Sequence, residues 1–195
     1  MATLYKLTDQ DGKTRAGQPG ETQWGPGVRH EATGEPDQPL CTDGWIHAYE
    51  SRLLAVLLNP IHANLADPKL WRCRGRIGKR DGQLKCGCRA LTTVREIPVP
   101  QIIDKQQVRF GIACAWPTCE VPEWRTWARK WLTGEDRTAA AAVAAWTAAA
   151  VAAVAAWTAW TAATAAEEAD LDLIRIAEWA VTDQPIEALY PEVAK

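Results

Sequence analysis

The sequence predicts an α+β protein: a β-rich N-terminal module with one short helix, followed by an all-helical part rich in alanine and tryptophan. Three observations support this prediction. Gly, Pro and Asp-Gly turn signals separate short alternating segments up to about Asp104. Apolar residues then recur at helical spacing, and the 29 residues from Thr138 to Ala166 contain no charge, Gly or Pro. We therefore expect two domains, 1–104 and 105–195.

Short strands and one helix are expected before residue 69. Thr3–Thr8 reads as a strand that ends at the Asp11-Gly12 turn. Residues 17–39 are rich in Gly and Pro, which favours a loop that carries only short strands. Ser51 is a suitable N-cap for a helix over Arg52–Leu58, which Asn59-Pro60 ends.

A long β-hairpin is the most readable feature of the N-terminal module. Its strands, Lys69–Gly78 and Gln83–Ile97, flank Asp81-Gly82, a dipeptide that favours a two-residue type I′ turn. Alternation at period two then gives an apolar face and a basic face. The apolar face holds Trp71, Cys73, Gly75, Ile77, Cys86, Cys88, Ala90 and Thr92. The basic face holds Arg72, Arg74, Arg76, Gly87, Leu91 and Arg89, with Arg89 directly across from Arg74.

Two short helices are expected after the hairpin. Val108–Cys119 is apolar and predicts a helix as far as Trp116, before Pro117. Pro122 opens the next helix, and Gly134 is placed to end it. This second helix carries tryptophans at i, i+3 and i+7, namely Trp124, Trp127 and Trp131.

The alanine-rich segment, residues 138–166, is long enough to cross a membrane. Alanine is only marginally apolar, however, and no basic residues flank the segment, so we expect a buried central helix and no membrane span. A last amphipathic helix is predicted from Glu167 to Val181, with acidic residues near its N-terminus.

Charge and cysteine content limit the functional classes. The net charge is −2, divided as about +3 over residues 1–105 and −5 over 106–195. The N-terminus lacks an apolar signal segment, which favours a reducing cytoplasm. The six cysteines form no CxxC pair, so we expect buried thiols and no metal or cofactor. The alternative is a metal cluster of Cys41, Cys73, Cys86 and Cys88.

The basic hairpin is the leading candidate for a binding site. Arg74 opposite Arg89 would place like charges side by side, which destabilises a sheet unless solvent or an anion lies between them. Guanidinium groups suit phosphate or carboxylate, so Arg72, Arg74, Arg76 and Arg89 are candidate anion ligands. The alternative is a solvated face, or a docking face for the acidic C-terminal residues. Because the whole chain is slightly acidic, the case for nucleic acid is weak.

Two further sets of residues have both a structural and a functional interpretation. His47 follows a turn near Asp43 and Cys41, an arrangement compatible with a small catalytic site, although a lone histidine is more often structural. No GxSxG, P-loop, GxGxxG or HExxH motif accompanies it. Trp124, Trp127 and Trp131 are candidate partner-binding residues by stacking, although their helical spacing favours core packing.

Residues 39–49, PLCTDGWIHAY, are followed by the apolar run 53–57 and by Leu70-Trp71 before Gly75. This pattern resembles an uncharacterised module of phage and bacterial proteins with a signature close to LCxxGFHAC/Y. Trp45-Ile46 replaces the single aromatic residue of the signature, and Tyr49 stands where a cysteine is common. The likeness covers about residues 1–100 and implies interest in His47 without assigning it a role.

A second resemblance, to helical immunity proteins of bacterial toxin systems, rests on three segments: Arg109–Cys114, residues 127–136 and the alanine-rich segment. That likeness implies a partner-binding bundle. Together the two resemblances imply a non-catalytic, phage-encoded accessory factor that inhibits or sequesters a host-defence component, either a protein or an anionic nucleotide signal. The alternatives are a small enzyme centred on His47 and an assembly protein that forms a homo-oligomer through its alanine-rich helix.

Overall fold

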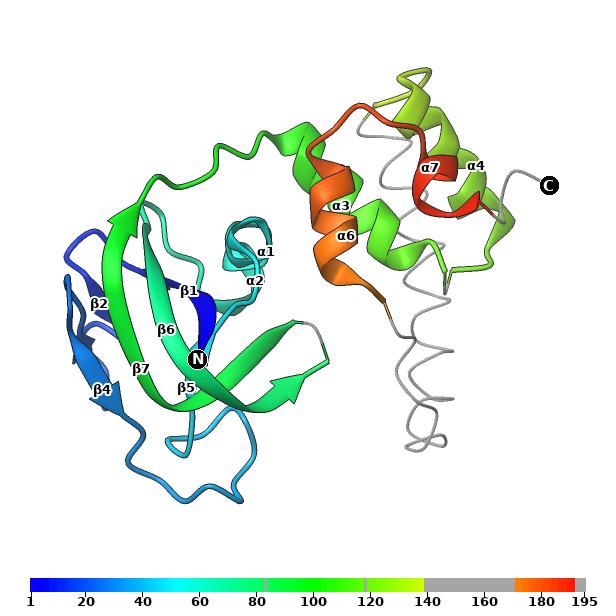
Figure 1. Cartoon of the computed structure of the whole chain (residues 1–195). Helices are drawn as coiled ribbons and strands as arrows, with labels where there is room; N and C mark the ends of the chain where they lie inside the picture. Colours follow the sequence, from blue (N-terminus) through cyan, green and yellow to red (C-terminus); the bar gives the residue numbers. More distant parts are fainter. Residues whose placement is uncertain (83, 118, 139–170, 192–195) are drawn as a thin grey trace. The chain divides into compact units, whose positions relative to one another are not determined.

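The computed structural model describes residues 1–82, 84–117, 119–138 and 171–191 (Figure 1). It is an α+β protein with an antiparallel sheet in the N-terminal half and helices mostly later in the chain. The chain divides into two compact units, Met1–Ile102 with Asp172–Ala177, and Ile103–Leu171 with Glu178–Lys195. The division near residue 102 lies close to the expected boundary at Asp104, and the assignment of 172–177 to the first unit was not expected.

The first unit is built on a five-stranded sheet in the order β1-β6-β7-β4, with β5 also paired to β7. All of its pairings are antiparallel. A separate two-stranded sheet pairs β2, which precedes the predicted loop region 17–39, with β3, which lies within it. The strands are β1 Ala2–Thr8, β2 Lys13–Thr14, β3 Thr22–Gln23, β4 Arg29–Glu31, β5 Ile46–Ala48, β6 Lys69–Asp81 and β7 Lys85–Ile97.

A short helix, α1 (Arg52–Leu57), follows β5 as expected, and the Ser51 hydroxyl accepts a hydrogen bond from the Leu54 amide at 3.4 Å. Asn59-Pro60 ends this helix but also begins a second turn, α2 (Asn59–His62). Proline fits there because the first turn of a helix needs no N–H from it. The described helices include none that is both long and apolar enough to cross a bilayer.

The hairpin forms, but its predicted register is wrong. Asp81 pairs with Lys85, so residues 82–84 make a three-residue loop in place of the expected two-residue turn. Gly82 has a φ of 48° there, and the Leu84 amide donates to the Asp81 carbonyl at 2.9 Å. Register shifts also follow Arg72, Gly75 and Ile77, where bulges let the two long strands curve strongly (Figure 1).

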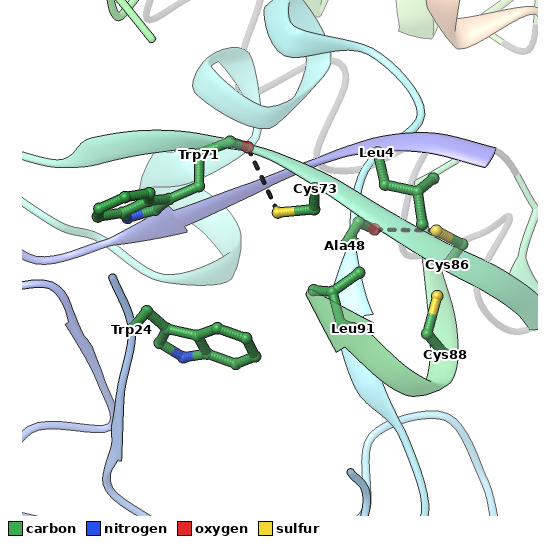
Figure 2. Close-up of a cluster of buried hydrophobic side chains, with 8 residues drawn as sticks. All are labelled: Leu4, Trp24, Ala48, Trp71, Cys73, Cys86, Cys88 and Leu91. Atoms are coloured by element: carbon green, nitrogen blue, oxygen red, sulfur yellow. Dashed lines mark hydrogen bonds between the residues drawn. The ribbon is translucent and has the colours of Figure 1, made fainter. Parts of the chain in front are cut away.

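The apolar face of the sheet covers a core rich in thiols and aromatic rings (Figure 2). Cys73, Cys86 and Cys88 are fully buried in it, as the alternation of the two strands predicted. In β7, Leu91 is buried where Ala90 was expected, because the bulge changes the phase of the strand. The core residues are Leu4, Trp24, Ala48, Trp71, Cys73, Cys86, Cys88 and Leu91.

Lys6 is the one lysine buried on this apolar side among the described residues. Its ammonium donates to the His47 carbonyl at 3.0 Å and lies 4.8 Å from the centre of the Trp24 ring. Burial lowers the pKa of Lys6 to about 8, against smaller opposing effects of the Cys73 and Cys88 thiols. A cation therefore lies under the sheet, in addition to those on its outer face.

The second unit contains α3 (Asp104–Ala115), α4 (Pro122–Thr133) and α7 (Ile186–Leu189). Helix α3 begins four residues before the expected Val108, because the Gln106 side chain accepts the Ile103 amide at 3.0 Å and satisfies the first turn. Helix α4 begins at Pro122 and ends before Gly134, whose φ of 85° is left-handed, both as predicted.

The last amphipathic helix is described only from Leu173 to Ala180, as α6, which crosses the boundary between the two units. The Asp172 carboxylate accepts the Arg175 amide at 3.0 Å at its beginning. The predicted central helix, residues 138–166, lies outside the described residues except for its first residue, as does the start of the expected last helix at Glu167.

Candidate anion-binding site

Strand β6 carries three exposed arginines at alternate positions, Arg72, Arg74 and Arg76. The residues between them, Cys73 and Gly75, are buried. Because successive side chains of a strand point to opposite faces, the three guanidinium groups project from one face, about 6.6 Å apart along the strand. This part of the predicted basic face is confirmed.

A fourth arginine, which the sequence analysis did not select, joins them from β7. Arg95 is exposed and lies directly opposite Arg72 in the register. Directly paired residues of an antiparallel ladder project to the same side, with Cα atoms about 5 Å apart. We call Arg72, Arg74, Arg76 and Arg95 the arginine face.

Polar side chains from the neighbouring strands complete the arginine face. Tyr5 of β1 lies opposite Arg72, while Thr3 of β1 and Thr92 of β7 lie on either side of Arg74. Thr3 is exposed, and Tyr5 and Thr92 are half-buried. Hydroxyl groups therefore stand beside the guanidinium groups, in positions from which they can donate to an anion.

The arginine face is closed at one end by apolar residues. Leu7 of β1 pairs with Leu70 of β6 on the same side of the sheet, and both are buried. Helix α1 packs beside β1 there and buries Leu54 and Leu57 (Figure 1). The face is thus exposed from Arg72 to Arg76 and covered on the side of Leu70.

The arginines of this face have no acidic partner. Within the residues that the structure describes, no hydrogen bond or salt bridge involves any of the four guanidinium groups. Two other arginines of the unit are paired with acids: Arg80 donates twice to the Glu50 carboxylate, at 2.9 and 3.0 Å, and Arg29 of β4, which lies across Thr92 from Arg74, is paired with Glu31. Arg15 and Arg52 are likewise exposed without an acidic partner among the described residues, so what distinguishes this face is that its unpaired arginines lie at neighbouring positions of paired strands.

Arg89, the fourth predicted anion ligand, belongs to a different environment. Arg74 faces Thr92 and not Arg89, because the longer loop and the bulges shift the register. The Arg89 guanidinium donates to the carbonyls of Gly34 at 2.6 Å, Gly44 at 2.5 Å and Ala32 at 3.5 Å. Its donors are used to hold the loop before β5, so the prediction that Arg89 shares a face with Arg74 is wrong.

The residues of the expected catalytic site are near in sequence but serve separate contacts. The His47 Nε2 atom lies 2.5 Å from the Leu40 carbonyl oxygen, and Lys85 donates to the Cys41 sulfur at 3.1 Å. Asp43 is exposed, and its backbone carbonyl accepts from Gly34. Among the described residues, His47, Asp43 and Cys41 share no hydrogen bond.

Burial lowers the pKa of His47, and the charges of Lys85 and Lys6 lower it further, against the opposing effect of the Leu40 carbonyl. The imidazole is therefore neutral near pH 7, with its Nε2 proton directed at a backbone carbonyl, as expected of a structural histidine. In the described part of the chain, no three His, Cys, Asp or Glu side chains come together as potential metal ligands.

The predicted partner-binding tryptophans pack inside the second unit. Trp124 and Trp131 are buried, and Trp127 is half-buried. The Trp124 ring lies 5.9 Å from that of Trp116 and 6.4 Å from that of Trp127, and Arg137 covers Trp131 at 5.1 Å. Their helical spacing thus serves core packing, and their rings leave little surface for a partner.

No family model, curated protein or solved structure matches this chain. The assignment of a function therefore depends on the chemistry of the arginine face itself. Arg95 was missed because the bulge after Arg72 brings it opposite that arginine; the three-residue loop alone would pair Arg95 with Trp71.

Proposed function

We propose that this chain is a non-catalytic binding protein that holds a phosphate-bearing ligand on the arginine face. The observation that supports this proposal is the set of four exposed guanidinium groups, none of which is paired with a carboxylate of the described residues. Like charges directly opposed on two strands, as at Arg72 and Arg95, cost about 0.2–1 kcal/mol. An anion between them removes that cost and gains charge-assisted hydrogen bonds.

Arginine is the residue type best suited to this task. Its planar guanidinium presents parallel N–H donors that match two oxygens of a phosphate, and it stays charged at any physiological pH. No lysine is paired with Arg72 or Arg74 in the described strands, whereas the same hairpin carries Lys79 and Lys85 elsewhere. The composition of the face therefore favours phosphate recognition over a merely solvated surface.

Titration of the labelled full-length protein with ATP and with inorganic pyrophosphate tests the proposal, followed by amide chemical shifts in NMR. We expect shifts at Arg72, Arg74, Arg76 and Arg95, and at least about tenfold weaker binding in a triple variant of Arg72→Gln, Arg74→Gln and Arg76→Gln. One charge-assisted hydrogen bond contributes about 1.5–3 kcal/mol, which is why the loss of several is easily measured.

A control triple variant removes the same charge from other exposed sites, with Arg15→Gln, Arg52→Gln and Lys130→Gln. Equal loss of affinity in both variants would indicate unspecific attraction and contradict the proposal. His47→Gln is expected to leave the affinity unchanged. A selective loss in His47→Gln, with the arginine variant unaffected, would instead favour the enzyme centred on His47.

The finer expectations from the sequence belong to the same proposal. In it, the second unit is an all-helical bundle, and the alternative is an assembly protein whose copies associate through the alanine-rich segment. The protein works in the cytoplasm of a bacterial host, an assignment supported by six free thiols. A phage-encoded role against a host-defence component is compatible with an anionic nucleotide signal on the arginine face or with a protein target.

A further inference from the structure

The arginine face is linear. Arg72, Arg74 and Arg76 follow one strand, and at about 3.3 Å per residue the distance along the strand from the first to the last is about 13 Å. A single phosphate meets only neighbouring members of such a row. A chain of phosphates, by contrast, can meet each guanidinium in turn, so the geometry favours an extended polyanion.

An aromatic ring stands at the closed end of this row. Tyr5 lies in the register between Arg72 on one side and Tyr49 on the other. Tyr49 is itself buried and held by His62 of α2, whose Nδ1 lies 3.0 Å from the tyrosine oxygen. Tyr5 is only half-buried, and within the described residues its hydroxyl takes part in no hydrogen bond. Part of the Tyr5 side chain is therefore accessible, at a position directly paired with Arg72.

Two threonine hydroxyls lie on either side of the middle arginine. Thr3 of β1 and Thr92 of β7 both pair with Arg74, so a hydroxyl donor lies on each side of the line of arginines. Side-chain hydroxyls commonly donate to phosphate oxygens in complexes with nucleic acids. The face therefore offers charge along the strand, hydroxyls across it, and an aromatic ring at one end.

We infer that the ligand of the arginine face is a single-stranded nucleic acid, an inference that rests on the proposed function. The phosphates follow Arg76, Arg74 and Arg72, while an unpaired base stacks on Tyr5. Stacking on a protein ring requires a base whose face is exposed, which a duplex does not offer within its length. The net charge of −2 does not oppose this inference, because Glu31, the acidic residue that the β4–β7 register places on this side of the sheet, is paired with Arg29.

Fluorescence anisotropy of the full chain with a labelled oligothymidylate of about 12 nucleotides tests the inference, since single-strand sites span about 4–16 nucleotides. The logarithm of the binding constant should fall with the logarithm of salt concentration with a slope of about −2 to −3, because each neutralised phosphate contributes about −0.7. The triple arginine variant should lose about 2 of that slope.

Tyr5→Leu should weaken binding about tenfold with an unchanged salt slope, because it removes stacking and no charge. Tyr5→Phe is the matched control and should retain the affinity, which separates loss of the ring from loss of the fold. Equal thermal melting of the three proteins completes the comparison. An unchanged affinity in Tyr5→Leu would overturn the inference.

Competitors separate this inference from the proposed function. Inorganic polyphosphate, the duplex of the same length, or poly-glutamate that competes as well as the oligothymidylate would overturn the single-strand assignment. If polyphosphate competes equally, the anion-binding proposal still stands. If poly-glutamate competes equally, the ligand is instead an acidic protein. If ATP, pyrophosphate and the oligothymidylate all leave the amides of the arginine face unshifted, both proposals fail.

Discussion

The two strands of one hairpin use the same side chain in opposite ways. On β6, Arg72, Arg74 and Arg76 project into solvent with no acidic partner among the described residues. On β7, Arg89 points into its own fold and donates to three backbone carbonyls. The difference shows that a cluster of basic residues in sequence is not yet a binding site. A guanidinium is available to a ligand only when the fold leaves its donors unused.

Replacement of Arg89 should have the largest effect on stability. Arg89→Ala leaves the carbonyls of Ala32, Gly34 and Gly44 without their donor, and hydrogen bonds from a charged group contribute about 1.5–3 kcal/mol each. We expect the free energy of unfolding to fall by about 3–4 kcal/mol, measured by urea denaturation, since water replaces part of the loss.

Arg74→Ala on the opposite strand is the matched variant. Its side chain has no partner among the described residues, so the unfolding free energy should stay unchanged while anion affinity falls. Equal destabilisation by the two substitutions would remove the distinction between a structural and a free arginine on this hairpin.

Lys6 extends the comparison to the opposite face of the sheet. The pKa of Lys6 is lowered to about 8, mainly by burial, from an unfolded value of 10.5. Between these two pH values the unfolded state binds more protons than the folded state, so stability rises with pH across that window. Lys6→Met should abolish this rise, which amounts to about 3 kcal/mol.

The measured quantity is the difference between wild type and Lys6→Met in urea denaturation at several pH values. Burial raises the pKa of the Cys73 thiol to about 12 and the Lys6 charge opposes this, so both proteins are compared in a Cys73→Ala background, from which the titration of this thiol is absent. A difference that is constant from pH 7 to 10.5 would mean that the ammonium is solvated and not buried under the sheet.

Local patterns predicted much of this fold. Ser51, Pro122 and Gly134 each act through their own backbone or through a neighbour within one turn, and each ended or began a helix as expected. Alternation along β6 likewise placed its arginines and Cys73 on the correct faces. These predictions depend on short-range geometry, which a sequence records directly.

Partners between strands could not be predicted in the same way. The loop at residues 82–84 and the bulges moved Arg89 away from Arg74 and brought Arg95 opposite Arg72. A bulge is stabilised by the packing of distant residues, here Leu91 in place of Ala90 in the core, and no local motif marks it. The sheet's loops, such as the one that Arg89 holds, are likewise determined by contacts across more than 40 positions.

The smallest predicted effect concerns the repulsion within the arginine face. Arg72 and Arg95 are directly opposed, and the energy of such a like-charge pair falls as salt screens it. Arg72→Gln should therefore stabilise the free protein by a few tenths of a kcal/mol, about the lower limit for a cross-strand pair, at low ionic strength and not at 1 M salt. The double variant with Arg95→Gln should gain nothing more, because either single change removes the pair; a double-mutant cycle by urea denaturation measures this non-additivity.

When an oligothymidylate is bound, the effect of Arg72→Gln on the unfolding free energy should change sign, so that the wild type becomes the more stable protein. If Arg72→Gln destabilises the free protein, the two guanidinium groups do not repel each other, and an anion bound to this face would relieve no repulsion.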